Sequence, residues 1–255
     1  MSRDASRSDP ALAPTPRPRR RGLPPTVAAL IAGIVAAGLS GTASETFVGL
    51  FAPAEKAGAP ADPSLDPDDG EQRTPEERRG LVLDATLTYA VQGALLGLLL
   101  GLAGGASGGS VPTAGLGAGI GGMVGAIVCG LGAFGLFTVY VNHVDPVAPQ
   151  LLAPLSTRSI LWGVMGGVGG LAFGVGLGDE NSLGGTILGG ATGGLLAALL
   201  YELGGLMLGP DARPILPLAG EPRARLFAHG LIGVLVALGA VRGLSDAPEA
   251  STDST

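Results

Sequence analysis

The sequence predicts an all-α membrane protein, a polytopic bundle of about six glycine-rich transmembrane helices. Three features of its composition lead to this class: 46 of the 255 residues are glycine, 14% are charged and 46% are of hydrophobic types. An ordinary soluble domain contains about 7% glycine and about 25% charged residues. Collagen is excluded because glycine does not recur at every third position.

Long uncharged runs locate the six helices. No Asp, Glu, Lys or Arg occurs anywhere between Asp84 and Asp145, and none occurs in 22–44. A helix needs about 20 residues to cross the hydrocarbon core of a bilayer. The glycine- and proline-containing stretch 108–112 divides the longest run into two helices. The predicted spans are 25–44, 85–105, 115–140, 159–178, 184–209 and 226–242.

The segments outside these spans have the composition of solvated polypeptide. Residues 1–24 predict a disordered basic arm, since they hold six arginines and no apolar periodicity. Residues 45–84 predict an acidic Pro-rich loop, with ten acidic and four basic residues, and residues 243–255 predict a disordered acidic tail. Between them, 85–242 is the five-helix transmembrane region.

The first hydrophobic segment has two interpretations. Basic residues before it and small residues after it are typical of a secretory signal, whose apolar core is about 7–15 residues long. The uncharged run of 22–44 is longer than such a core. A retained first transmembrane helix over 25–44 is therefore favoured over a cleaved signal.

Basic residues leave the orientation in conflict. If the arm is inside, the inner segments hold seven basic residues, and the loops after the first, third and fifth spans hold eight. The positive-inside rule then does not decide between the two orientations, whereas the last five helices taken alone would place these three loops inside. We expect six spans in the cell membrane with both termini in the cytoplasm.

Small residues recur at every fourth position along most of the spans, on one face of each helix. Such lines let helix backbones approach closely, which matters in lipid because no hydrophobic force drives one helix onto another. The alternative is that some of these faces line a pore whose width glycine sets. The glycines expected to pack helices are Gly93, Gly97, Gly101, Gly117, Gly121, Gly125, Gly166, Gly170, Gly174, Gly189 and Gly193.

An internal similarity suggests a duplicated helical hairpin. Adding 72 to each residue number lays 117–128 onto 189–200 with matching side-chain sizes, and the helices before them match at a shift of 70. The repeats would cover 85–155 and 159–220, an arrangement found in some transport proteins. Chance matching of Gly-, Ala- and Leu-rich sequence is the alternative.

Motifs for catalysis are absent from the sequence. The GxGxxG-like string at 117–122 lies inside a predicted span with no strand before it, so it does not indicate a dinucleotide site. The two histidines have no metal-ligand spacing, and Cys129 is expected to pack as a small apolar residue. We expect no enzyme, no metal, no cofactor and no nucleic-acid binding. The expected partners are the lipid bilayer and, for the arm, anionic lipid headgroups; a homo-oligomer is left open.

A few polar residues lie within the spans and are expected in one half of the bilayer. Gln92, Glu202 and His229 all lie near the span ends that adjoin the first, third and fifth loops. An ionised carboxylate in the membrane costs a few kcal/mol and usually finds a partner. His229 and Arg225, which lie one helical turn apart on the same face, are the two candidate partners of Glu202.

Two functions follow from these residues, and both stay open. The first is a non-catalytic, tightly packed bundle that serves as a structural or assembly module. The second is an ion or proton channel or transporter that uses Glu202, His229, Gln92 and Arg225. A bundle without a water-accessible cavity beside Glu202 favours the first, and a cavity open toward the fifth loop favours the second.

Overall fold

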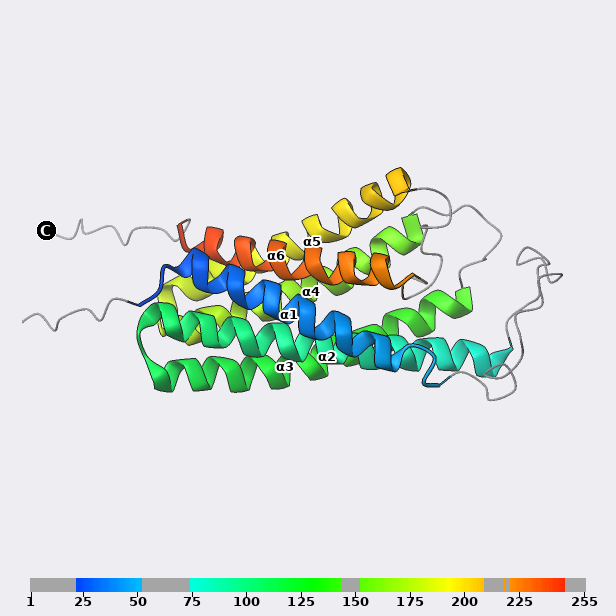
Figure 1. Ribbon diagram of the computed structural model, residues 1–255, viewed down its shortest axis with the longest axis horizontal. Helices are drawn as coiled ribbons and strands as arrows, with labels where there is room; N and C mark the ends of the chain where they lie inside the picture. Colours follow the sequence, from blue (N-terminus) through cyan, green and yellow to red (C-terminus); the bar gives the residue numbers. More distant parts are fainter. Residues whose placement is uncertain (1–21, 52–73, 144–151, 209–217, 219–220, 246–255) are drawn as a thin grey trace, which may run out of the picture.

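Six long helices form one bundle (Figure 1) in the computed structural model, which describes residues 22–51, 74–143, 152–208, 218 and 221–245. No strand occurs in this part of the chain, and the six helices are all long and apolar enough to cross a membrane. The predicted number and order of helices are therefore confirmed. The elements are α1 (Pro25–Phe47), α2 (Pro75–Gly108), α3 (Val111–His143), α4 (Leu152–Leu177), the short 3₁₀ turn η1 (Glu180–Ser182), α5 (Leu183–Leu208) and α6 (Pro222–Ser245).

The second helix is longer than its predicted span, and the predicted loop 45–84 is correspondingly shorter. Pro75 occupies the first turn of α2, and the Thr74 side chain accepts a hydrogen bond from the Glu77 N–H at 3.3 Å while Glu77 Oε2 accepts from the Thr74 N–H at 2.9 Å. This reciprocal cap starts the helix although the sequence is charged. At 1.5 Å per residue, the 34 residues of α2 extend about 50 Å, beyond the ~30 Å of a hydrocarbon core.

Other predicted boundaries change less. α1 continues to Phe47 and α6 to Ser245, so the first residues of the predicted loop and of the predicted tail are helical. The basic arm up to residue 21, the loop over 52–73 and the tail from 246 lie outside the described residues.

Successive helices alternate in direction (Figure 1). The end of α1 therefore lies beside the starts of α2, α4 and α6, and we call this the loop end of the bundle. The opposite end, the turn end, holds the short connections after α2 and α4. Gly109 and Gly178 close these connections with φ angles of 68° and 72°, a conformation that favours glycine.

Four helices surround the centre of the bundle. α1, α2, α4 and α6 contact one another in a ring, while α3 packs outside α2 and α4, and α5 packs outside α4 and α6. Toward the turn end the ring is filled by fully buried side chains, among them Leu100, Phe173 and Val236. This half of the bundle has a solid apolar core.

Neighbouring helices approach most closely at glycines. A Cβ added to Gly97 would overlap the backbone of Gly121 on α3, and one added to Gly166 would overlap the backbone of Gly190 on α5. At all eleven glycines that the sequence places at helix contacts, an added Cβ would lie within 3.0 Å of an atom of another helix. At these positions a side chain would push the helices apart.

The two hairpins α2–α3 and α4–α5 correspond at an offset different from the predicted ones. Gly97 pairs with Gly121 in the first, and Gly166 pairs with Gly190 in the second, so the offset is 69 for both partners. The predicted shifts of 70 and 72 are wrong as structural registers. Gly193, which the shift of 72 matches to Gly121, packs against α6 at the Leu235 backbone. A shift of 72 differs from 69 by about one helical turn, which also brings small residues into register.

We expect Gly121→Leu and Gly193→Leu each to lower the unfolding free energy by about 1–3 kcal/mol, because each side chain overpacks a helix contact. Thermal unfolding in detergent micelles measures the effect. The matched controls are Gly119→Leu on α3 and Gly184→Leu on α5, where an added Cβ meets open space. They should keep or raise the melting temperature, since glycine is a poor helix former. Equal melting of all four variants would show that the helices do not meet at Gly121 and Gly193.

The alternating helix directions predict which residues share a side of the membrane. In a Cys129→Ala background, which removes the chain's one cysteine, single cysteines at exposed Asn181 and Glu221 should react with an impermeant maleimide from opposite sides. If the termini are cytoplasmic, Asn181→Cys is labelled from the cytoplasm. Reaction of both cysteines from the same side of sealed vesicles would contradict six spans.

Candidate functional site

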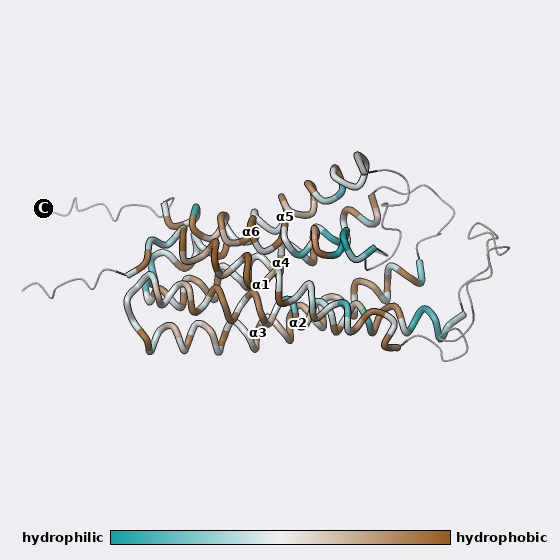
Figure 2. Tube along the Cα trace, in the orientation of Figure 1, coloured by the Kyte–Doolittle hydropathy of each residue, from teal (hydrophilic) through white to brown (hydrophobic). Residues whose placement is uncertain are grey.

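Hydrophilic residues are concentrated along the loop-end half of the bundle (Figure 2). Most of the buried polar residues come from this half of α1, α2, α4 and α6. They are Ser40, Ser44, Asp84, Thr88, Gln92, Arg158, Arg225 and His229. Burying so many polar groups among apolar helices is costly unless each has a partner or a use.

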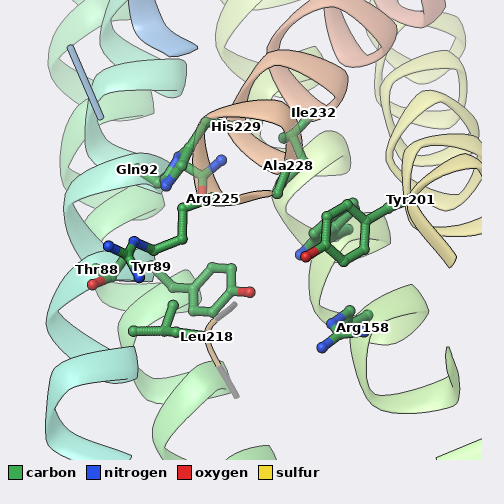
Figure 3. A pocket seen from close by; sticks show the side chains of 11 residues that line it. Thr88, Tyr89, Gln92, Arg158, Tyr201, Leu218, Arg225, Ala228, His229 and Ile232 are labelled. Atoms are coloured by element: carbon green, nitrogen blue, oxygen red, sulfur yellow. The ribbon is translucent and has the colours of Figure 1, made fainter. Parts of the chain in front are cut away.

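A cavity of about 20 Å³ lies among these residues, between α2, α4, α5 and α6 (Figure 3). This volume is sufficient for a water-sized occupant, which needs about 10–15 Å³. Leu218, from the segment between α5 and α6, lies at the loop-end side of the cavity (Figure 3). The lining residues are Thr88, Tyr89, Gln92, Arg158, Trp162, Tyr201, Leu218, Arg225, Ala228, His229 and Ile232.

One ion pair joins α4 to α5 beside the cavity. Arg158 Nη1 donates a hydrogen bond to Glu202 Oε1, with side-chain exposures of 5% and 20%. The Arg158 guanidinium also lies over the ring of Tyr201, with its Cζ 5.3 Å from the ring centroid. Both contacts hold the guanidinium in place at the cavity wall.

A second ion pair joins α6 to α1. Arg225 donates from Nε to Glu45 Oε1 at 2.9 Å and from Nη2 to Glu45 Oε2 at 2.6 Å, a two-pronged contact that fixes the orientation of both groups. The Arg225 side chain is 6% exposed and that of Glu45 is 41% exposed. Glu45 therefore lies nearer the surface of the bundle than the arginine that it neutralises.

Glu202 pairs with neither of its two predicted candidate partners, Arg225 and His229, in the ion pairs of the described residues. The structure pairs Arg225 with Glu45 and Glu202 with Arg158. Glu45 and Arg158 lie one residue outside the predicted spans 25–44 and 159–178. They were therefore interpreted as loop residues and were not included among the candidate polar residues within the membrane. The helices continue past both residues, which brings both side chains into the bundle.

His229 links α6 to α1. Its Nδ1 lies 3.0 Å from Ser40 Oγ, and both side chains are buried. A serine beside a histidine is a catalytic arrangement only where a substrate can reach the hydroxyl. Ser40 is 2% exposed, donates to the Ala37 carbonyl at 3.3 Å and does not line the cavity. The contact therefore serves to position the two helices.

Two buried polar atoms of the cavity wall accept or donate no hydrogen bond within normal geometric limits among the residues that the structure describes. Thr88 Oγ1 and Trp162 Nε1 are both buried and unpaired, in residues that are 2% and 1% exposed. An unsatisfied buried group costs about 1–3 kcal/mol. Both residues line the cavity, and the Tyr89 hydroxyl lies close enough to Trp162 to interact with it.

Of the four candidate residues predicted from the sequence, Gln92, Arg225 and His229 line the cavity together, whereas Glu202 does not line it and pairs with Arg158. Sequence reasoning missed Trp162, Thr88 and the buried Asp84. The Asp84 carboxylate accepts hydrogen bonds from the N–H groups of Gly49 at 2.8 Å and Phe51 at 3.2 Å, and so anchors the turn after α1.

Comparison with known proteins adds no family to this description. No protein-family description matches the chain, and neither the curated proteins nor the solved structures contain a match. In the described part of the chain, no three His, Cys, Asp or Glu side chains are grouped as metal ligands.

We expect Glu202→Gln to lower the unfolding free energy by roughly 3 kcal/mol, because it removes the carboxylate charge that faces the buried Arg158 guanidinium. The double variant Arg158→Leu with Glu202→Leu should recover most of this loss, since it removes both charges. Thermal unfolding in micelles measures both, with Glu221→Gln at the exposed start of α6 as the control. A Glu202→Gln protein as stable as the control would show that this ion pair does not form.

Proposed function

We propose that the protein is a multi-pass protein of the cell membrane that binds an ion in the loop-end cavity and carries it across the bilayer, as a channel or transporter. The observation that carries this proposal is the cavity itself, which lies beside the Arg158–Glu202 pair and has Leu218 in its lining. Ionisable groups inside a membrane are costly, and those that persist usually mark ion or substrate pathways.

The outer surface of the bundle supports its insertion into lipid. Large apolar side chains that are more than half exposed lie on several helices, including Ile31, Ile34, Leu131, Leu188 and Leu203. In water such a surface would be an aggregation hazard, whereas in a bilayer it contacts acyl chains. In lipid the close approaches at glycine then become the main source of helix association.

The two ends of the bundle suggest how transport would be gated. The cavity lies at the loop end, and the centre of the turn-end half is filled by buried side chains such as Leu100 and Val236. An ion could therefore enter from the loop end, and its release at the other side requires the helices to separate there. We propose that the structure corresponds to the state in which the site communicates with the loop end only.

A second candidate is a non-catalytic structural or assembly module. The observation that favours it is the density of the bundle, in which helix backbones touch at glycines and the cavity is small. In that case the polar cluster would serve only to fix the relative positions of α1, α4, α5 and α6. The two candidates differ in whether the purified protein moves ions.

We expect the purified protein in liposomes to dissipate an imposed ion gradient, and Gln92→Leu to reduce the flux by about tenfold or more. Leucine keeps the approximate size of the side chain and removes the amide from the cavity wall. Ion-selective electrodes and pH-sensitive dyes follow the flux, and the control is Thr192→Val at an exposed position of α5. A parent protein that moves neither protons, cations nor anions would favour the structural module instead.

A further inference from the structure

We infer that a groove on the outer face of the bundle, between α5 and α6, binds one zwitterionic phospholipid, with an acyl chain in the groove and the headgroup phosphate at Arg242. This site is separate from the loop-end cavity and does not depend on ion transport. Three observations lead to it: the residues that line the groove, its dimensions and the order of the charges at its turn end.

The groove follows the contact between α5 and α6 in the turn-end half of the bundle. Its glycines lie where the two backbones touch, Gly185 against Gly243 and Gly189 against Gly239. Large apolar side chains that the bundle leaves exposed line it as well. These are Leu188, Leu196 and Leu238, which are 71%, 48% and 40% exposed. In a bilayer such a lining contacts acyl chains.

The groove has the cross-section of a single hydrocarbon chain. Its lining on α5 runs from Asn181 to Leu196, which corresponds to about 20 Å at 1.5 Å per helical residue. Its volume of about 670 Å³ spread over this length gives a mean cross-section of about 33 Å². A helix of a second copy, about 10–12 Å in diameter, needs about 80–110 Å² and does not fit. An acyl chain is one carbon wide, about 4–5 Å, and does fit.

The groove extends through one leaflet of the bilayer. Arg242, in the last turn of α6, lies at its turn end, where the uncharged run 226–241 stops. From there the groove runs toward the middle of the membrane for about 20 Å, more than the ~15 Å that one leaflet contributes to the hydrocarbon core. A whole acyl chain of the turn-end leaflet can therefore lie in it.

Charges of both signs follow at the turn end, in the order of a zwitterionic headgroup. Arg242 adjoins the contact of Gly243 with Gly185; it is exposed, and no carboxylate of the described residues forms an ion pair with it. Asp179 and Glu180, also exposed, precede α5 and so lie farther from the middle of the membrane. In phosphatidylethanolamine the phosphate lies next to the acyl chains and the ammonium group lies beyond it. A guanidinium binds phosphate, and carboxylates attract ammonium.

Two substitutions separate the groove from the headgroup contact. Gly184 lines the groove, and an added Cβ there meets open space, so Gly184→Leu fills the groove without disturbing a helix contact. Arg242→Gln removes the charge at an exposed position. The matched controls are Gly119→Leu, at an open position of α3, and Arg223→Gln, at the exposed start of α6 at the loop end.

Native mass spectrometry of the purified protein in uncharged detergent counts the lipids bound. The probes are phosphatidylethanolamine, phosphatidylglycerol and diacylglycerol with the same acyl chains. We expect one phosphatidylethanolamine to bind saturably, and Arg242→Gln to weaken it by about fivefold, the equivalent of about 1 kcal/mol for one arginine near the membrane surface. Diacylglycerol, which has no phosphate, should bind more weakly and be insensitive to Arg242→Gln.

Gly184→Leu should weaken both phosphatidylethanolamine and diacylglycerol by about tenfold, because it takes the space of the chain that they share. Both controls should bind as the parent does. Phosphatidylglycerol should bind less tightly than phosphatidylethanolamine, since its headgroup has no ammonium group for Asp179 and Glu180. Circular dichroism and the melting temperature show which variants are folded, and Arg242→Gln keeps the test decisive if Gly184→Leu does not fold.

Lipid binding that a folded Gly184→Leu protein retains would overturn the groove as the site. Arg242→Gln weakening both lipids equally, or neither, would overturn the phosphate contact. Phosphatidylglycerol bound as tightly as phosphatidylethanolamine would overturn the zwitterionic headgroup. A dimer that Gly184→Leu dissociates, with no lipid bound, would show that a second copy occupies the groove instead.

Discussion

Close contact between helix backbones is the constraint on which the rest of this structure depends. Toward the turn end, glycines such as Gly97, Gly166 and Gly233 bring neighbouring backbones together and leave no room for a Cβ. Toward the loop end the contacts change: Gly41 faces the Leu226 side chain, and Gly204 faces the Phe227 ring. Side chains rather than backbones separate the helices there. The cavity among the buried polar residues lies in this looser half, where side chains rather than backbones set the distance between the helices.

The two ion pairs give this space its polarity. Arg158 and Arg225 belong to α4 and α6, two helices of the central ring, and each pairs with a carboxylate on a different neighbouring helix. Each pair is neutral as a whole, which lowers the cost of holding charge among apolar helices. Arg158 and Arg225 line the cavity, whereas Glu202 and Glu45 do not. A packed apolar bundle would not need this arrangement for stability, since well-packed hydrophobic residues of similar volume are often as stable as a buried ion pair.

Much of the fold could be predicted from the sequence, and the pairing of its parts could not. Uncharged runs defined six helices, and their alternation placed Gln92, Arg225 and His229 at one end of the bundle. The ends of those runs gave the wrong helix ends, because Glu45 and Arg158 belong to helices that extend past the apolar stretch. Gly233, Gly239 and Gly243 of α6 contact α1 and α5. They are not all four residues apart, so the sequence pattern did not indicate a packing face on this helix. Thr88 and Trp162 are uncharged, and only the packing of the helices shows that both line the cavity.

The central claim is that the bundle is open to water at the loop end and closed at the turn end. Cysteine accessibility along α6 tests it most directly, because Ala228 lines the cavity and Ala237 is fully buried against Gly33 of α1. In a Cys129→Ala background, Ala228→Cys should react with a small, impermeant thiol reagent from the loop-end side only, and Ala237→Cys from neither side. An unreactive Ala228→Cys, or reaction of Ala237→Cys from the turn-end side, would contradict this account.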